Sequence, residues 1–275
     1  MISIHPQNMG FKNIVILTGA GISADSGLST FRDSGGLWEQ YRLEEIATPE
    51  AFHNNPTLVW KFYSMRRIEA AKASPNLAHF ALVEYARNHP EKKVTLITQN
   101  VDGLHHRADP HEELSPLCMH GSLNESRCTH CGEIYFDDYA YFNLNGDYAP
   151  TQLNLCNESQ RASPRYLHHY KLQYRKFLPL SPCCNQDLRP HIVWFGEYPL
   201  YMEKIQPLLR ECDLFVSIGT SGNVYPAAGF LQVAKSHGAK TVCLNKEEIL
   251  QHDLCDEFIA GRAIDIVSQY FKKLT

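Results

Sequence analysis

A glycine-rich turn directly after a short apolar run constrains the fold of this chain more than any other feature. The apolar residues 14–17 lead into Gly19-Ala20-Gly21-Ile22-Ser23-Ala24, which fits the G-x-G-x-x-G/A pattern. Without side chains, the backbone N–H groups of such a turn can approach a pyrophosphate at the start of a helix. An ordinary strand–turn–helix connection fits the same residues. The acidic residue that a dehydrogenase places on a second strand about 20 residues later is missing, which disfavours hydride transfer.

Short apolar runs separated by helical stretches predict an α/β fold. Helical character lies between several of the runs, for example over residues 77–88 and 226–237. This alternation is typical of a Rossmann-like, doubly wound parallel sheet, in which ligands bind at the carboxyl ends of the strands. The four strands that we expect are residues 14–17, 94–98, 214–218 and 241–244.

Two regions interrupt this alternation. Residues 38–75 are helical in character and rich in aromatic side chains, whereas residues 124–188 are loop-like and contain five of the nine cysteines. We expect both regions to pack together as a smaller inserted domain, helical and zinc-binding. The Rossmann-like NAD-binding domain would then comprise residues 1–37, 76–123 and 189–275.

The bulk composition excludes several classes of protein. A net charge of −4 and a pI of about 6.4 provide no basic field for nucleic acid or anionic membranes. No apolar run approaches the roughly 20 residues that span a bilayer, and the first residues lack the features of a secretory signal. We therefore expect a cytoplasmic monomer with reduced thiols or metal-bound cysteines. Four cysteines are expected as small core residues: Cys118, Cys212, Cys243 and Cys255.

Three further side chains carry chemistry that suits a dinucleotide. Asn100 and Asp102 follow the strand predicted at residues 94–98, and His120 precedes a glycine. Imidazole has a pKa close to neutrality, as a general base at pH 7 requires. The Asp102 carboxylate can hydrogen-bond an amide and so orient nicotinamide. Together with the glycine turn, these groups indicate an enzyme that consumes NAD.

The order of the short motifs resembles that of the sirtuin family. Seven blocks carry the resemblance, which extends from about Asn13 to Arg262: residues 19–27, Thr30-Phe31-Arg32, residues 98–102, His120-Gly121-Ser122, residues 188–197, Gly219-Thr220-Ser221 and residues 224–228. Asp25 stands where the family usually has Glu, and Val101 where it usually has Ile. Both departures conserve charge or shape.

The resemblance implies that NAD is a consumed co-substrate of a protein-lysine deacylase. The acyl oxygen attacks ribose C1′, nicotinamide leaves from a pocket near Asn100 and Asp102, and His120 acts as general base. The products are lysine, nicotinamide and O-acyl-ADP-ribose. His105 and His106 have no such role and are expected to be structural. The cofactor-binding positions carried over from the family are Gly19, Ala20, Gly21, Ser23, Asp25, Phe31, Arg32, Gln99, Asn100, Val101, Asp102, Gly219, Thr220, Ser221, Asn245, Lys246, Glu247 and Ala263.

The same resemblance implies how an acylated lysine is recognised. An extended substrate peptide would pair with Val193, Phe195, Gly196 and Glu197 on one side and with Val224 on the other. Main-chain pairing of this kind tolerates many substrate sequences.

A Tyr-x-x-Arg pair suggests an acyl pocket for acidic groups. Tyr63 and Arg66 share one face of the helix expected over residues 58–71. Such a pair, with a small residue at Ala47, resembles the desuccinylase-type branch, and a guanidinium binds a carboxylate through its planar fork. We therefore expect removal of succinyl and malonyl as well as acetyl groups. A solvated Arg beside a packing Tyr is the alternative interpretation.

The metal site departs from the family pattern. Cys128-Thr129-His130-Cys131 is half of a tetrahedral zinc site, but Ser181 stands where the third cysteine is expected. We assign Cys128, Cys131, Cys183 and Cys184 as ligands of a structural zinc. Because adjacent cysteines rarely reach one ion together, Cys156 and His130 are alternatives to Cys183.

Two further function classes fit the residues. ADP-ribosyl transfer or NAD hydrolysis could occur at the same site, without acyl transfer. A non-catalytic NAD-sensing module is the other, and the combination of His120, Asn100 and Asp102 argues against it.

Overall fold

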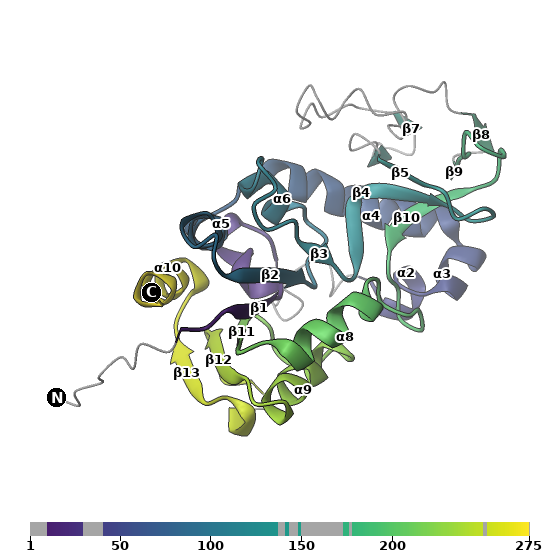
Figure 1. Ribbon diagram of the computed structural model, residues 1–275. Helices are drawn as coiled ribbons and strands as arrows, with labels where there is room; N and C mark the ends of the chain where they lie inside the picture. Colours follow the sequence, from purple (N-terminus) through teal and green to yellow (C-terminus); the bar gives the residue numbers. More distant parts are fainter. Residues whose placement is uncertain are drawn as a thin grey trace.

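A parallel sheet of six strands forms the centre of the larger part of the molecule (Figure 1). The computed structural model describes residues 10–29, 41–136, 141–142, 148–149, 173–175, 178–249 and 252–274. The sheet order is β13-β12-β11-β1-β2-β3, so the order reverses between β1 and β11, and the predicted doubly wound fold is confirmed. The strands are β1 (Asn13–Thr18), β2 (Lys93–Thr98), β3 (Leu117–Cys118), β11 (Leu214–Ile218), β12 (Lys240–Asn245) and β13 (Glu257–Ala260).

The four predicted strands correspond to β1, β2, β11 and β12, whereas we did not predict the two outermost strands. β3 has two residues, which is too short for any periodicity, and β13 contains a charged residue and only four positions. Both lie at sheet edges, where burial on two faces no longer imposes a continuous apolar run.

Helices cover both faces of the sheet. Ile14 and Ile16 pack in one core cluster with α5 (Leu77–Asn88) and α10 (Ala263–Lys273). Val15 and Leu17 point to the opposite face and pack with α8 (Met202–Glu211) and α9 (Phe230–Ser236). Alternating side chains of one strand therefore fill two cores, as the pleat requires. The helix expected at residues 77–88 is confirmed, whereas the one expected at 226–237 begins with a 3₁₀ turn, Ala227–Gly229.

A smaller module adjoins the carboxyl edge of the sheet. Its helices α2 (Leu43–Ile46), α3 (Pro49–Asn54) and α4 (Pro56–Lys72) pack against an antiparallel sheet of order β10-β4-β5. These strands are β4 (Gly121–Cys128), β5 (Ile134–Phe136) and β10 (Leu188–Ile192). Residues 124–188 were expected to be loop-like, and the structure instead places strands at both ends of this range. The β4–β10 pair joins residues about sixty positions apart, which leaves no local pattern. The domain boundaries themselves stay a prediction.

Other described elements are short. They are α6 (Leu104–Ala108), which follows β2, and the strand pairs β6 (Tyr141–Phe142) with β7 (Tyr148–Ala149) and β8 (Tyr174–Arg175) with β9 (Leu178–Pro179). The longest described helix is α4, with 17 residues. Among the residues that the structure describes, no helix combines the length and the apolar character needed to cross a membrane.

Two of the predicted core cysteines are joined. Cys243 on β12 and Cys255 before β13 form a disulfide, with Cα atoms 6.1 Å apart. The expectation of reduced thiols is therefore wrong for this pair. The parallel pairing of β12 with β13 brings the two cysteines together, and no pattern in the sequence predicts this pairing. Cys118 and Cys212 are free thiols, partly buried and buried respectively.

Candidate functional site

The glycine turn lies where the strand order reverses. Gly19 N donates to Ile218 O at 3.0 Å, and Gly21 N donates to Gly219 O at 2.8 Å. A Cβ at either Gly19 or Gly21 would lie 2.8 Å from Gly219 O, so neither position accommodates a side chain without displacement. The turn continues as two 3₁₀ turns, Ala20–Ile22 and Ala24–Ser26, in place of the expected α-helix. Such a crevice at the strand ends is where doubly wound folds bind ligands.

Ser23 joins the glycine turn to the two polar residues after β2. Its Oγ donates to Asp102 Oδ2 at 2.8 Å and accepts from Asn100 Nδ2 at 3.1 Å. Asn100 and Asp102 are both buried. Burial raises the pKa of Asp102, while hydrogen bonds from Leu104 N and Ser23 oppose that shift. The structure thus brings together an amide and a carboxyl group that the sequence predicts for nicotinamide.

Two buried histidines lie behind this group: His105, which we expected to be structural, and His79, whose contribution we did not predict. His79 Nε2 is 3.4 Å from Ser23 Oγ, and His105 Nε2 is 2.9 Å from Thr18 Oγ1. Burial lowers the pKa of His79 to about 4 and that of His105 well below its usual value, so both are neutral at pH 7. His79 also closes the capping box at the start of α5 with Asn76. The Asn-x-x-His spacing was the available signal.

His120 is held with one ring nitrogen available. Its Nδ1 lies 3.1 Å from Gln99 O, and because a carbonyl only accepts, Nδ1 carries the proton and Nε2 keeps a lone pair. Burial lowers the pKa of His120, and the hydrogen bond to Gln99 partly opposes this. The Gln99 side chain donates from Nε2 to Thr220 Oγ1 at 3.0 Å. One residue therefore connects the imidazole with the loop after β11.

The residue after His120 has to be glycine. Gly121 adopts a φ of +84°, and a Cβ there would collide with His191 O on β10. The close approach of the two backbones fixes the point at which β4 begins and therefore the direction of the His120 side chain.

The predicted adenosine-binding residues lie along the same edge of the sheet. Asn245 ends β12 and donates from Nδ2 to Glu247 O at 2.7 Å, while Ala263 begins α10. Asp25 Oδ1 lies 3.5 Å from Arg262 Nη1, at the start of that helix. Lys246 and Glu247 are exposed, Ser221 is partly buried, and Val101 O accepts from Leu123 N. Phe31 and Arg32 lie outside the described residues.

The residues of the predicted acyl pocket gather around Trp194. Tyr63 is buried and its Oη accepts from Trp194 Nε1 at 3.0 Å. Ala47 lies in the same core cluster, and its carbonyl accepts from Phe195 N at 3.0 Å. The Arg66 side chain is 12% exposed and 3.5 Å from Glu69. Burial lowers the pKa of Arg66, and the carboxylates of Glu69 and Asp102 oppose this shift.

The predicted peptide-binding segment is anchored at both ends. Val193 N donates to His120 O at 2.9 Å, which sets the segment beside the imidazole. Arg189 binds both oxygens of Glu197, at 2.7 and 2.9 Å. Burial opposes ionisation of Glu197, but the hydrogen bonds from Arg189 and from Trp194 N lower its pKa. Gly196 has a φ of +88°, and the side chains of Phe195, within this segment, and of Val224 are exposed.

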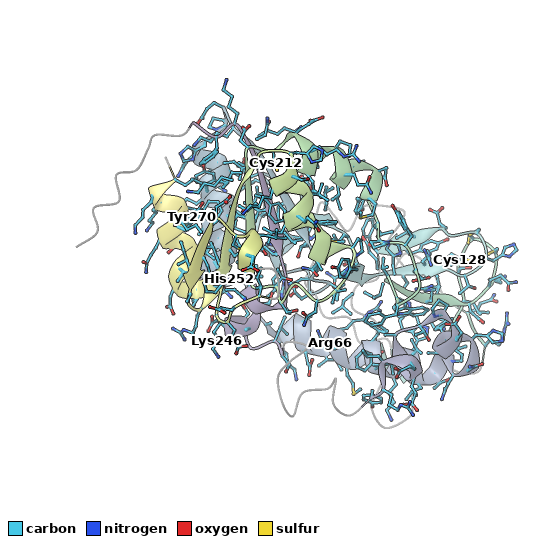
Figure 2. The ribbon with its side chains drawn as sticks, turned by 90° about the horizontal axis from the view of Figure 1, so that it is seen from below. Arg66, Cys128, Cys212, Lys246, His252 and Tyr270 are labelled. Carbon is cyan, nitrogen blue, oxygen red and sulfur yellow. A yellow bond between two sulfur atoms is a disulfide. The ribbon has the colours of Figure 1, made fainter. Side chains whose placement is uncertain are left out.

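Four cysteine sulfurs come together in the small module. Figure 2 shows one of these residues, Cys128, at the far end of the module. The Sγ atoms of Cys128, Cys131, Cys183 and Cys184 all lie within 4.8 Å of one another. A tetrahedral zinc with Zn–S bonds of about 2.3 Å places its sulfurs about 3.8 Å apart, so the cluster fits the ion. Ser181 Oγ lies 3.2 Å from Cys128 Sγ, in contact with the cluster.

Of the two alternative fourth ligands, only His130 lies among the described residues, and it is not part of the cluster of four sulfurs. His130 is exposed on the connecting turn, and Cys156 lies outside the described residues. Adjacent Cys183 and Cys184 both reach the site, with Sγ atoms 3.5 Å apart.

The doubly wound sheet, the glycine turn and the His120 imidazole together define a dinucleotide-binding protein. The cluster of four cysteines adds a metal-binding module. Residues 19–226 match the model of the Sir2 family, and the chain belongs to this family. A Pasteurella multocida protein named NAD-dependent protein deacylase is 44% identical over 94% of this chain and 95% of its own length. A protein of the same name from Salmonella typhimurium is 40% identical over 98% of this chain and 86% of its own length. The structure of a Sir2 homologue in complex with NAD aligns with this chain with a TM-score of 0.76 and 32% identity. The alignment covers 97% of this chain and 91% of the homologue.

Proposed function

We propose that this chain is an NAD-dependent protein-lysine deacylase that removes acetyl and acidic acyl groups, with nicotinamide and O-acyl-ADP-ribose as products. The observation that carries the proposal is the convergence of the glycine turn, Asn100, Asp102 and His120 at the point where the strand order reverses. Relatives named NAD-dependent protein deacylase, similar over nearly the whole chain, support it.

Each side chain has a defined task in this reaction. When bound, NAD supplies a ribose carbon that becomes electrophilic as the nicotinamide bond breaks. Asn100 and Asp102 present an amide and a carboxyl group that hold the nicotinamide carboxamide. His120 accepts a proton from a ribose hydroxyl at Nε2, because Nδ1 is engaged with Gln99 O. NAD would lie along the glycine turn and the loop of Thr220, towards Asn245.

Arg66 supports the proposed preference for acidic acyl groups. It is a mostly buried guanidinium on α4, on the same helix face as Tyr63 and under the electrostatic influence of Asp102. An apolar pocket would desolvate a carboxylate without compensation, whereas a guanidinium binds it through two parallel hydrogen bonds. The small side chain of Ala47, in the same core cluster as Tyr63, would leave more room for an acyl group than a larger residue.

The protein substrate would bind as an extended strand between residues 193–197 and Val224. Exposed Phe195 and Val224 border this path, and Val193 is tied to His120 by a main-chain hydrogen bond. Acylated lysines of proteins are therefore the proposed substrates. Cytoplasmic location and a monomeric state stay predictions.

The test is to incubate the purified chain with NAD and matched acetyl-lysine and succinyl-lysine peptides and to follow the products by mass spectrometry. Faster loss of succinyl with O-succinyl-ADP-ribose is the expected result. Loss of acetyl only would keep the deacylase and overturn the acidic pocket. Nicotinamide release without acyl loss would instead show NAD hydrolysis or ADP-ribosyl transfer, the two readily separated by looking for ADP-ribose on protein.

A further inference from the structure

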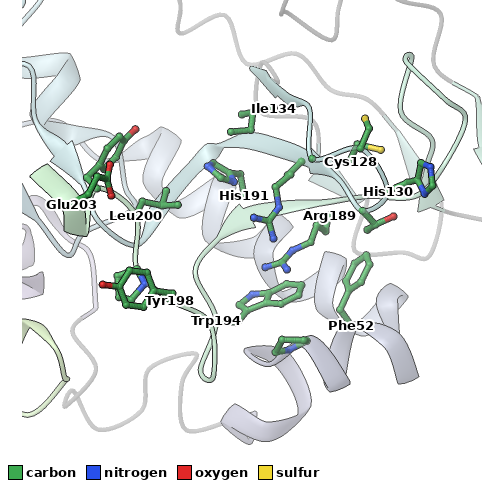
Figure 3. Close-up of a pocket in the computed structure, with 17 residues that line it drawn as sticks. Phe52, Cys128, His130, Ile134, Arg189, His191, Trp194, Tyr198, Leu200 and Glu203 are labelled. Carbon is green, nitrogen blue, oxygen red and sulfur yellow. The ribbon is translucent and has the colours of Figure 1, made fainter.

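A second hollow lies outside the proposed reaction site (Figure 3). It has a volume of about 820 Å³ and lies between α3, the β4–β10 strand pair and residues 198–203. Neither the glycine turn nor Asn100, Asp102 or His120 lines it. Its volume is in the range of pockets that bind small molecules, about 300–1,000 Å³.

Two guanidinium groups form the floor of this pocket. Arg127 on β4 and Arg189 on β10 are directly opposite each other in the antiparallel pair. Like charges in that arrangement are destabilising unless an anion lies between them. Glu197 provides one carboxylate, but Arg189 binds both of its oxygens, at 2.7 and 2.9 Å.

Arg127 therefore keeps most of its hydrogen-bonding capacity. Its Nη2 is 3.4 Å from Glu197 Oε1, and within the described part of the chain this is the one hydrogen bond of the Arg127 side chain. The side chain is 32% exposed. His191, beside it, is neutral at pH 7, since burial and the two arginines lower its pKa to about 4, and it lies 3.8 Å from Glu125. Glu203 lines the opposite end of the pocket, away from the guanidinium groups (Figure 3).

Apolar side chains form part of the pocket wall, and the turn that carries Cys128, His130 and Cys131 forms another part. Phe52 and Trp194 lie on one side, Leu200 and Tyr198 on another, and Ile134 of β5 above them (Figure 3). Arg189 stacks over the Trp194 ring at 3.4 Å from its centroid. A ligand that fits this lining has a hydrocarbon or aromatic body and one anionic end.

We propose that this pocket is a binding site for small monocarboxylates with an aromatic or aliphatic body, whose carboxylate is held by the Arg127 guanidinium. The planar fork of Arg127 matches the two carboxylate oxygens. The single Glu197 carboxylate only partly offsets the repulsion between Arg127 and Arg189. A bound carboxylate would reduce this repulsion further.

Trp194 connects this pocket with the acyl pocket. One face of the residue borders the second pocket, while its Nε1 donates to Tyr63 Oη. A ligand that shifts Trp194 therefore changes the position of Tyr63. This coupling rests on the proposed function, whereas binding itself does not.

The test is a calorimetric titration of the full chain, which is first saturated with ADP-ribose. The probe is 4-phenylbutyrate, and the uncharged 4-phenylbutyramide is the matched control. We expect the carboxylate to bind at least tenfold more tightly than the amide. Arg127→Gln should abolish this difference, whereas Arg127→Lys should retain part of it. Arg66→Met, in the acyl pocket, should leave it unchanged.

Three outcomes would overturn the proposal. They are equal binding of both probes, binding that survives Arg127→Gln, and binding that is lost in Arg66→Met. The thermal midpoint and the ADP-ribose affinity of Arg127→Gln are measured as well, to show that the variant is folded. Arg127→Lys is the second variant, because it keeps the positive charge at this position. Deacylation does not enter the readout, so failure here leaves the proposed function untouched.

Discussion

Two regions of the molecule are held together by different kinds of interaction. They are the proposed NAD-facing edge, around Ser23, Asn100, Asp102 and His120, and the proposed acyl-facing module, made of α2, α3, α4 and the β10-β4-β5 sheet. At the edge, side chains from the segments that follow β1 and β2 are joined by hydrogen bonds, as Ser23 is to Asn100 and Asp102. In the module, aromatic rings such as Phe52, Tyr63 and Trp194 pack together, and four cysteine sulfurs close its outer end. Directional bonds fix the geometry around the reacting atoms, while packing shapes a pocket whose preference can change without altering the chemistry.

The largest effect should come from the NAD-facing edge. His120→Ala removes the proposed base, and we expect deacylation to fall by about 10²–10⁴-fold. Exchange of labelled nicotinamide into NAD should persist, because Asn100, Asp102 and Ser23 are unchanged. Steady-state deacylation and nicotinamide exchange, measured on the same preparation, check this. Loss of both activities in parallel would argue that His120 acts before nicotinamide leaves.

The acyl-facing module should control preference without controlling the chemistry. Arg66→Met should lower kcat/KM for a succinyl-lysine peptide by about tenfold to a hundredfold, the range of a hydrogen bond to a charged group. Activity on the acetyl peptide should change by less than about threefold. Lys61→Met, an exposed cation on the same helix, is the matched control and should affect neither. Equal losses for both peptides would contradict a role in acyl recognition.

Removal of zinc should separate the two regions further. Cys183→Ala, or treatment with a chelator, should lower the thermal midpoint by about 5 °C or more, because metal binding stabilises the module that holds the cluster. The affinity for ADP-ribose should change by less than about twofold, since the NAD-facing edge lies elsewhere. Differential scanning calorimetry and titration measure the two. Cys118→Ala, outside the cluster, is the control, and an unchanged midpoint in Cys183→Ala would exclude Cys183 as a ligand.

The smallest effect concerns pH. Burial lowers the pKa of His120 below its usual value of about 6.5, so the base stays neutral as the pH falls to that value. The acid limb of kcat/KM should therefore lie below pH 6.5, with activity lost as the imidazole becomes protonated. A pH–rate profile checks this, and a limb above pH 6.5 would contradict the buried setting of His120.

Sequence alone predicted the NAD-facing edge more fully than the acyl-facing module. The glycine turn and the strand before it are contiguous, so their pattern is visible in one short stretch. The partnership of Trp194 with Tyr63 joins residues 131 positions apart. Strands β4 and β10 of the module likewise pair about sixty residues apart, and the position of Arg189 opposite Arg127 depends on this pairing, which no local spacing encodes.

The two attachments of Gln99 bear on any redesign of cofactor use. Its side chain holds Thr220 while its carbonyl sets the protonation of His120. A variant that reshapes the loop after β11 to accept a modified dinucleotide would also release Gln99 and with it the tautomer of the imidazole. A change in dinucleotide preference would then lower turnover, because both depend on Gln99. A variant selected for a new dinucleotide would need a second substitution that restores the hydrogen bond to His120.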